Sequence, residues 1–277
     1  LREVTNWGVL SRRIRIGLEA FTSERVAEES TQLGFSGNYG ARLPQRLTYV
    51  GEDLEIPTAA GPIGKAFELQ EAVDAAVEVH KQATKVFFIV GNAGLGKTRM
   101  MVDTAMVRAQ EVEMNPELDV PLYLFVSSTG RALASLEDAV NSALNITKLL
   151  SAQGARTLCR NGLLVLFVDG FDELLGGTGY ENALGSLEPW FRDLGGRGVL
   201  VASARSSYYL TQYRRSLSET PGVAVDHVLA DLQPWSVDEC STYFSNQSLP
   251  AVVVNRIAAR EWDLLRLPFF AKAFVAW

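Results

Sequence analysis

The feature that most limits the fold of this chain is the octapeptide at residues 91–98, Gly-Asn-Ala-Gly-Leu-Gly-Lys-Thr. The apolar run Val86–Val90 precedes it, and the helix-favouring stretch Arg99–Gln110 follows it. A glycine-rich turn between a strand and a helix lets backbone N–H groups surround an anionic phosphate, and the helix N-terminus adds partial positive charge. The pattern G-x-x-x-x-G-K-[ST] in this setting predicts a phosphate-binding loop. A dinucleotide site is disfavoured because it requires the spacing G-x-G-x-x-G.

Two side chains of the octapeptide have individual roles in this interpretation. Lys97 is expected to reach the β- and γ-phosphates of a nucleotide, and the Thr98 hydroxyl is expected to bind Mg²⁺. The remaining cofactor-binding residues are expected to surround the phosphates, and they are Gly91, Asn92, Ala93, Gly94, Leu95, Gly96 and Arg99. The alternative is a glycine-rich turn that matches the pattern by accident.

A second motif lies at residues 163–174, where an apolar strand ends in acidic residues. Asp169 at the carboxyl end of this strand is expected to bind Mg²⁺, directly or through water, at the sheet edge where ligands bind in doubly wound folds. Asp172 and Glu173 follow in the next turn, and either of them is a candidate to orient or deprotonate the water that attacks a γ-phosphate. Without the phosphate-binding loop, the same residues would be read as an ordinary acidic turn.

An arginine follows the next apolar strand, Val199–Ala204. Its position places the Arg205 guanidinium at the same sheet edge, where it is expected to sense the γ-phosphate or to stabilise charge in the transition state. A surface arginine with no catalytic role is the alternative.

Apolar strands and helical segments alternate from Lys85 onward, which predicts an α/β fold of three layers with a mainly parallel sheet. The predicted strands are Val86–Val90, Leu122–Val126, Leu163–Val168, Val199–Ala204 and Val225–Leu229. The predicted helices are Thr98–Glu113, Ala134–Leu150, Gly179–Leu194 and Tyr208–Ser218.

The chain divides into three predicted regions: an N-terminal region or linker of unknown role at 1–64, the P-loop core at 65–232, and the beginning of a helical subdomain at 233–277. In the first region, Arg12, Arg13 and Arg15 are interpreted as a solvated helix face, and Leu47–Ile56 as a strand or hairpin. A helix is predicted over Lys65–Thr84 from its apolar spacing.

The last region has helix signals of its own. Ser236 followed by Glu239 predicts a capping box that opens a helix through about Gln247. Pro250 is expected to begin a second helix that continues to about Arg260, and Pro268 is expected to be the first residue of a third.

Composition excludes some function classes. The chain has 277 residues, 47% of them hydrophobic, and a formal net charge of −6, which argues against a strongly basic nucleic-acid-binding surface. The two cysteines lack metal-ligand spacing, and the longest apolar run is too short to span a bilayer. A soluble cytoplasmic protein is therefore expected. Because the chain begins at Leu1 and ends at Trp277 within an apolar stretch, it is interpreted as part of a longer protein.

Together these segments resemble the NACHT branch of the STAND NTPases, which are signalling relatives of the AAA+ ATPases. The resemblance rests on residues 91–98 and on Val-Asp-Gly-Phe-Asp-Glu-Leu at 168–174, and more loosely on Ala-Arg-Ser at 204–206, Leu-Gln-Pro-Trp-Ser at 232–236 and Leu-Arg-Leu-Pro-Phe-Phe at 265–270. It covers roughly residues 65–277. Trp235 departs from the Phe that is usual in the family.

The resemblance implies that Pro268 contacts the adenine, that Asp172 is the principal acid–base group, and that the cofactors are ATP or ADP with Mg²⁺. It implies a slowly hydrolysing switch that forms homo-oligomers on activation by an unknown trigger ligand, with effector and sensor regions outside this chain, in immune or antiphage defence. An AAA+-like mechanical ATPase acting on protein or nucleic acid, and a small-molecule kinase, are the alternatives.

Overall fold

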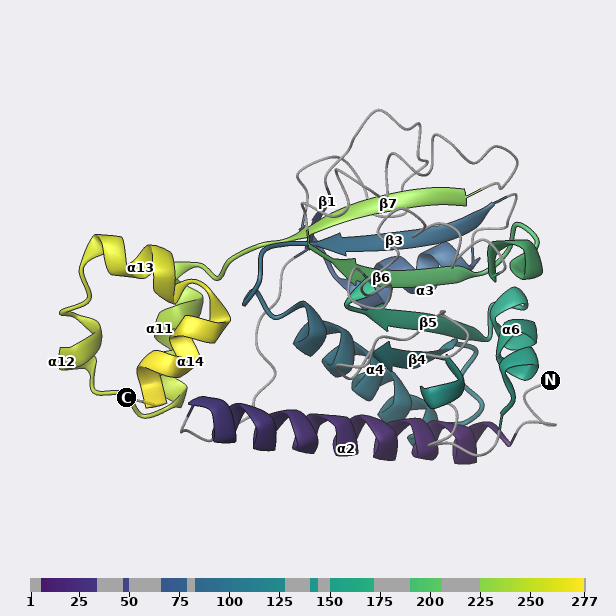
Figure 1. The fold of residues 1–277 in the computed structure, drawn as a ribbon, viewed down its shortest axis with the longest axis horizontal. Coiled ribbons are helices and arrows are strands. Elements are labelled where there is room, and N and C mark those ends of the chain that lie inside the picture. The colour runs from purple at the N-terminus through teal and green to yellow at the C-terminus, as the bar shows by residue number, and fades with distance from the viewer. Residues whose placement is uncertain are drawn as a thin grey trace.

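The computed structural model of this chain describes residues 6–33, 47–49, 66–78, 83–127, 140–143, 150–171, 190–205 and 225–276. Its centre is a seven-stranded sheet with the order β2-β1-β7-β3-β6-β5-β4 (Figure 1). The strands are β1 (Leu47–Tyr49), β2 (Ala66–Phe67), β3 (Thr84–Val90), β4 (Leu122–Ser127), β5 (Leu164–Asp169), β6 (Val199–Ala204) and β7 (Val225–Leu232).

From β7 through β3, β6 and β5 to β4, each strand is parallel to the next. Every residue of β5 and β6 is buried, which explains why these segments lack a polar face in the sequence. The short strand β1 is antiparallel to both β2 and β7 and extends the sheet at one edge. The predicted α/β fold with a mainly parallel sheet is therefore confirmed.

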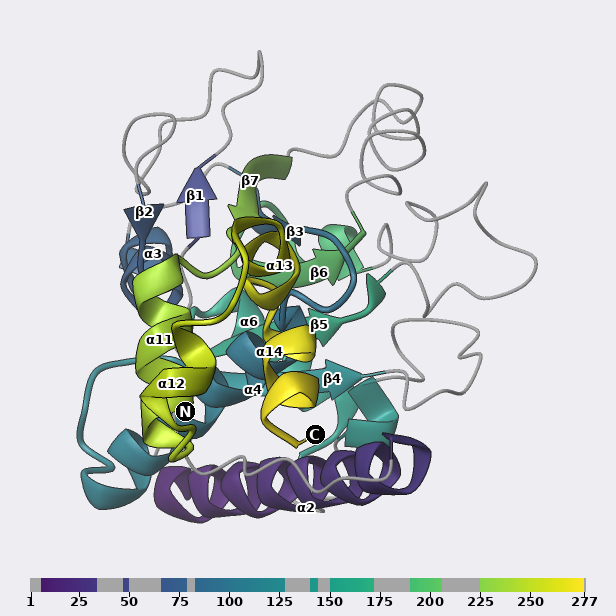
Figure 2. The same cartoon turned by 90° about the vertical axis from the view of Figure 1, so that its left-hand side faces the viewer.

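Helices α3 (Leu69–Glu78) and α4 (Lys97–Met114) lie on one side of the sheet when it is viewed along the strands (Figure 2). Helix α2 (Trp7–Leu33) packs along α4, and its buried residues belong to the same hydrophobic core as the sheet. These buried residues are Trp7, Leu10, Ile14 and Leu18. The N-terminal helix therefore takes part in the packing of the layered core.

Two arginines of the basic cluster of α2 pair with one carboxylate of α4. The Nε atoms of Arg12 and Arg15 donate to the two carboxylate oxygens of Glu113 at 2.8 Å and 2.7 Å. These bonds hold the pKa of Glu113 below its usual value. The predicted helix face is confirmed, and two of its three arginines pair with the adjacent helix.

The C-terminal residues form a small helical subdomain beyond the carboxyl ends of the strands (Figure 1). Its helices are α11 (Val237–Asn246), α12 (Ala251–Val254), α13 (Ala259–Leu265) and α14 (Pro268–Ala276). They enclose a hydrophobic cluster separate from that of the sheet, made of Trp235, Cys240, Tyr243, Phe244, Leu265 and Ala271. The sheet core and the C-terminal helices are thus two bodies, each with its own hydrophobic cluster, joined by a short connection.

The helix signals of this subdomain are largely confirmed. Ser236 Oγ accepts from the Glu239 N–H and the Glu239 carboxylate accepts from the Ser236 N–H, so the capping box is present. Pro268 begins α14 as predicted. The single helix predicted after Pro250 is wrong, because the chain forms α12, a turn and then α13, which starts where the Glu261 carboxylate accepts from the Ala258 N–H.

Two predictions in the core are also corrected. Within the helix expected over Lys65–Thr84, β2 precedes α3 and Thr84 is already in β3, while residues 79–82 lie outside the described residues. The helix expected to end at Leu150 does not include that residue, and α6 (Ala152–Arg160) begins instead after Ser151, whose side chain accepts from the Gly154 N–H. Residues 140–143 and 190–194 are helical, while the rest of the predicted helices 134–150, 179–194 and 208–218 falls largely outside the described residues.

Candidate functional site

The phosphate-binding loop connects β3 to α4, as the sequence predicts. Gly94 and Gly96 have φ angles of +81° and +90°, which side-chain-bearing residues rarely adopt. Gly96 occupies the N-cap position of α4, where it has no side chain to bond the first-turn N–H groups. Those N–H groups and the positive end of the helix dipole are the elements of an anion site.

Lys97 lies over this loop. Its Nζ donates to the Gly91 carbonyl oxygen at 2.7 Å and to the Asn92 carbonyl oxygen at 3.1 Å. Both acceptors belong to the loop itself, so the ammonium group is held against the loop. Asn92, Ala93 and Gly94 are exposed, whereas Leu95 is buried and anchors the loop in the hydrophobic core.

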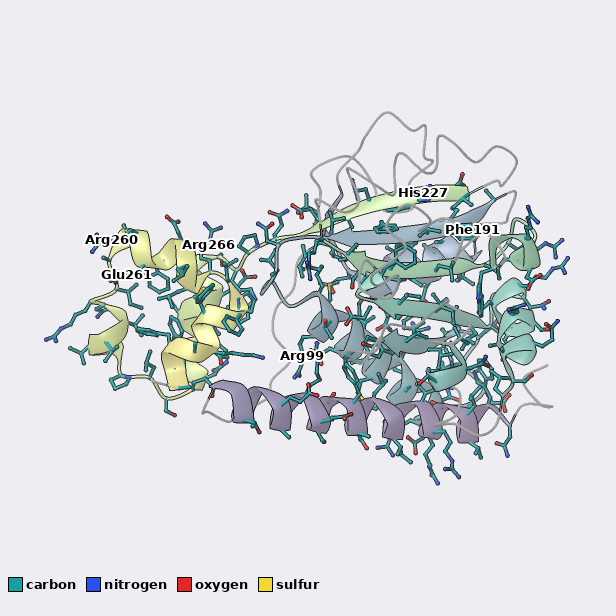
Figure 3. All side chains as sticks on the ribbon, viewed as in Figure 1. Arg99, Phe191, His227, Arg260, Glu261 and Arg266 are labelled. Carbon is teal, nitrogen blue, oxygen red and sulfur yellow. The ribbon has the colours of Figure 1, made fainter. Side chains whose placement is uncertain are left out.

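Arg99, which the sequence suggests as a nucleotide ligand, pairs within its own helix. Its Nε donates to Asp103 Oδ2 at 2.8 Å, one turn further along α4. Figure 3 shows Arg99 near the start of α4, on the side of the core that faces the helical subdomain. Thr98 beside it is half-buried.

The strand ends bring Asp169 to the same edge of the sheet. Asp169 is the last residue of β5, and β6 separates β5 from β3. Ser203 on β6 pairs in register with Ile89, next to the residue that precedes the loop. Because parallel strands end at one edge, the loop and Asp169 lie on that edge despite their separation in sequence.

Ser203 contacts the predicted metal ligand Asp169, a contact that the sequence did not predict. Its Oγ donates to Asp169 Oδ1 at 2.7 Å and accepts from the Gly170 N–H at 2.9 Å. Both Ser203 and Asp169 are buried, so these bonds fix the carboxylate. A small hydroxyl residue at the end of the strand beside the acidic strand was the available signal.

The chain has a P-loop NTPase fold. Of the remaining predicted site residues, Arg205 follows β6 immediately and is exposed at the same edge. Pro268 is buried at the start of α14, and the next residue, Phe269, donates its N–H to the Gly94 carbonyl at 3.3 Å. The helical subdomain therefore contacts the loop directly. Asp172 and Glu173 lie outside the described residues.

Known structures with a similar fold are distant from this chain. One is the Aeropyrum pernix ORC2 protein with ADPNP and ADP, at 15% identity and a TM-score of 0.40, covering 72% of this chain and 54% of that one. Another is a Walker-type ATPase of Pyrococcus abyssi, at 13% identity and a TM-score of 0.44, covering 69% and 61%. A third is the Aeropyrum pernix ORC1 protein in complex with DNA, at 16% identity and a TM-score of 0.42, covering 72% and 56%.

This chain thus spans between about half and three fifths of the length of those three proteins. No protein-family model and no curated protein matches it. Within the described ranges, no helix is long and apolar enough to cross a membrane.

Other titratable groups that the sequence analysis considered are buried away from the site chemistry. Burial raises the pKa of the Cys159 thiol and raises that of Cys240 to about 11. Both thiols are free, and neither is suited to nucleophilic or metal-binding chemistry at neutral pH. No group of three or more His, Cys, Asp or Glu side chains able to hold a metal occurs among the residues that the structure describes.

Proposed function

We propose that this chain binds ATP with Mg²⁺ at the carboxyl edge of its sheet and acts as a slowly hydrolysing, nucleotide-gated switch. The observation that carries the proposal is the contact between the phosphate-binding loop and the helical subdomain, through the Phe269 N–H and the Gly94 carbonyl. A phosphate bound by this loop lies beside the contact, so its binding can change how the two bodies are held together.

The residues at this edge suit the proposed ligand. The carboxylate of Asp169 and the hydroxyl of Thr98 supply oxygen ligands, which Mg²⁺ prefers. When bound, the metal would neutralise charge on the β- and γ-phosphates. Lys97 would bind the same phosphates, and Arg205 would stabilise charge on the γ-phosphate. Asp172, with Glu173 beside it, would orient or deprotonate the attacking water, and Pro268 would contact the base.

Packing of the connection between the two bodies supports a switch. Trp235 and Arg266 are joined twice: the Trp235 N–H donates to the Arg266 carbonyl at 2.9 Å, and Arg266 Nε donates to the Trp235 carbonyl at 2.6 Å. The connection is thus fixed to the helical subdomain at one end, while β7 fixes it to the sheet at the other. A movement of α14 against the loop would therefore be carried by the few residues between Leu232 and Trp235.

The finer assignment follows the resemblance to the NACHT branch of the STAND NTPases. On that basis ATP binding would drive homo-oligomerisation and activate effector regions outside this chain, in response to an unknown trigger, in immune or antiphage defence. The protein would act in the cytoplasm. An AAA+-like mechanical ATPase is the alternative, and the same experiment separates the two.

The test combines nucleotide binding, ATP turnover and assembly state for the wild type, Lys97→Ala and Asp172→Asn. Lys85→Ala is the matched control, because Lys85 lies on the same strand as the loop but at its opposite end. We expect Lys97→Ala to lose binding, Lys85→Ala to retain it, and Asp172→Asn to bind and assemble without turnover. Rapid turnover stimulated by DNA or unfolded protein would favour the mechanical ATPase, and a wild type that binds no nucleotide would exclude both.

A further inference from the structure

Asp231 is an acidic residue beside the phosphate-binding loop with no role in the function proposed above. It is the second-last residue of β7 and pairs in register with Val90, the residue immediately before the loop. On its other side it pairs with Thr48 of β1. Because it has a strand on each side, the position of Asp231 relative to the loop is fixed by the sheet.

The next residue confirms how close this strand end is to the loop. A Cβ placed on Gly91 would lie 3.6 Å from both the Cβ and the carbonyl oxygen of Leu232. The carboxyl end of β7 therefore packs against the first residue of the loop, whose carbonyl accepts from Lys97. The Asp231 carboxylate and the Lys97 ammonium attract each other, and the charge of Lys97 lowers the pKa of that carboxyl.

Asp231 is half-buried, and its surroundings shift the pKa of its carboxyl in opposing directions. Burial raises the pKa of its carboxyl, while the hydrogen bond from Gln233 and the charge of Lys97 lower it. Gln233 Nε2 donates to Asp231 Oδ2 at 3.1 Å and so stabilises the ionised form. The lysine is thus hydrogen-bonded to two loop carbonyls and is also attracted by the charge of the Asp231 carboxylate.

We propose that Asp231 is a counter-charge that competes with phosphate for Lys97 and thereby limits the affinity of the loop for nucleotide. This inference rests on the proposed function. To bind Lys97, a phosphate must displace the Gly91 and Asn92 carbonyl oxygens that accept from it. It must do so close to the negative charge of Asp231. Both effects oppose phosphate binding, and a lower affinity for nucleotide favours nucleotide exchange.

The test measures the affinity of fluorescently labelled ADP and ATP for the wild type, Asp231→Asn and Asp231→Glu. At low salt Asp231→Asn should bind about three- to tenfold more tightly, the effect of removing one partly screened charge. Asp231→Glu keeps the charge and should stay near the wild type. High salt should reduce the gain, since it screens charges that water reaches.

Asp226→Asn is the matched control. Asp226 lies on the same strand, near the end away from the loop, where it pairs in register with Lys85. Asp226→Asn changes the net charge by the same amount as Asp231→Asn and should leave the affinity for nucleotide unchanged. If Asp231→Asn does not fold, which its urea unfolding curve would show, Asp231→Ser replaces it.

Unchanged or weaker binding by the folded Asp231 variants would overturn the inference. An equal gain in Asp226→Asn would also overturn it, because net charge alone would then be responsible. If the wild type binds nucleotide and Lys97→Ala does not, the proposed function stands whichever result Asp231 gives. If the wild type binds none, the proposed function and this inference both fail.

Discussion

Ser203 and Asp169 are joined across neighbouring strands by a 2.7 Å hydrogen bond from the serine Oγ to the carboxylate Oδ1. The same Oγ accepts from the Gly170 N–H, so one hydroxyl fixes the strand end and its acid together. In the proposed function this acid helps to hold Mg²⁺, which makes the serine a positioning residue.

Replacement of Ser203 by Ala should therefore impair the site more than the fold. It removes the donor to Asp169 and leaves the Gly170 N–H without that acceptor, at a cost of about 1–3 kcal/mol in the free energy of unfolding. ATP turnover should fall, and a higher Mg²⁺ concentration should be needed for half-maximal turnover. Ser11→Ala is the control, since Ser11 is equally buried and bonds the Ala109 carbonyl on α4. An unchanged Mg²⁺ requirement in Ser203→Ala would argue against the positioning role.

Gly94→Ala should weaken nucleotide binding by disturbing the contact with α14. A Cβ at this position would lie 3.3 Å from the Phe269 Cβ, and the φ of +81° is unfavourable for alanine. The matched control is Gly195→Ala, where φ is +61° but the nearest atom to the new Cβ is Arg160 Nη2 at 3.7 Å. Both variants should lose about 1–2 kcal/mol of stability from the backbone conformation. Only Gly94→Ala should lose affinity in a nucleotide titration, and equal losses would refute the role of the contact.

Asp74→Ala should destabilise the protein more than Arg108→Met, although the two residues form one ion pair. Arg108 is only 1% exposed, and its guanidinium donates to both Asp74 oxygens and lies over the Tyr123 ring. Removal of Asp74 leaves a buried cation that still bonds Glu111 and the Pro121 carbonyl, and the loss of its hydrogen bonds to Asp74 should cost about 1.5–3 kcal/mol. Asp74 itself is 28% exposed, so water can solvate it when Arg108 is replaced. Urea unfolding at neutral pH measures the loss of free energy of unfolding in each variant, and a larger loss in Arg108→Met would contradict this account.

His227 should make the protein less stable as the pH falls. It lies buried on β7 near the strand's amino end, away from Arg99 in Figure 3, and burial lowers its pKa to about 4. The unfolded chain binds a proton near the ordinary pKa of about 6.5, so stability is lost between roughly pH 6.5 and pH 4. This loss is about 3 kcal/mol at most.

The measurement is the free energy of unfolding against pH for the wild type and His227→Leu. The wild type should lose stability across that range in excess of the variant, because leucine takes up no proton. Parallel curves would show that His227 is not responsible for the acid sensitivity.

Some of the architecture was readable from local patterns. The loop at 91–98, the capping box at Ser236 and the helix that begins at Pro268 each depend on a few adjacent residues, and their form follows from backbone geometry and hydrogen bonds within a turn. The helix α6 was missed although Ser151 gives it an N-cap and its buried residues Ala155, Leu158 and Cys159 have helical spacing, because it has only nine residues and Gly154 lies in its first turn. The turn between α12 and α13 was missed because the interruption lacks glycine and proline.

The sequence by itself thus determined the phosphate-binding loop, the buried strands that carry it and the acid at the end of β5. Tertiary structure alone decided which distant groups meet these elements: Ser203 on Asp169, Asp231 beside Val90, α2 along α4, and Phe269 on Gly94. The physical reason is the separation along the chain of the residues that stabilise each feature. A turn or a cap is stabilised by neighbours in the chain, whereas strand order and helix docking depend on burying apolar surface from segments that the sequence keeps far apart.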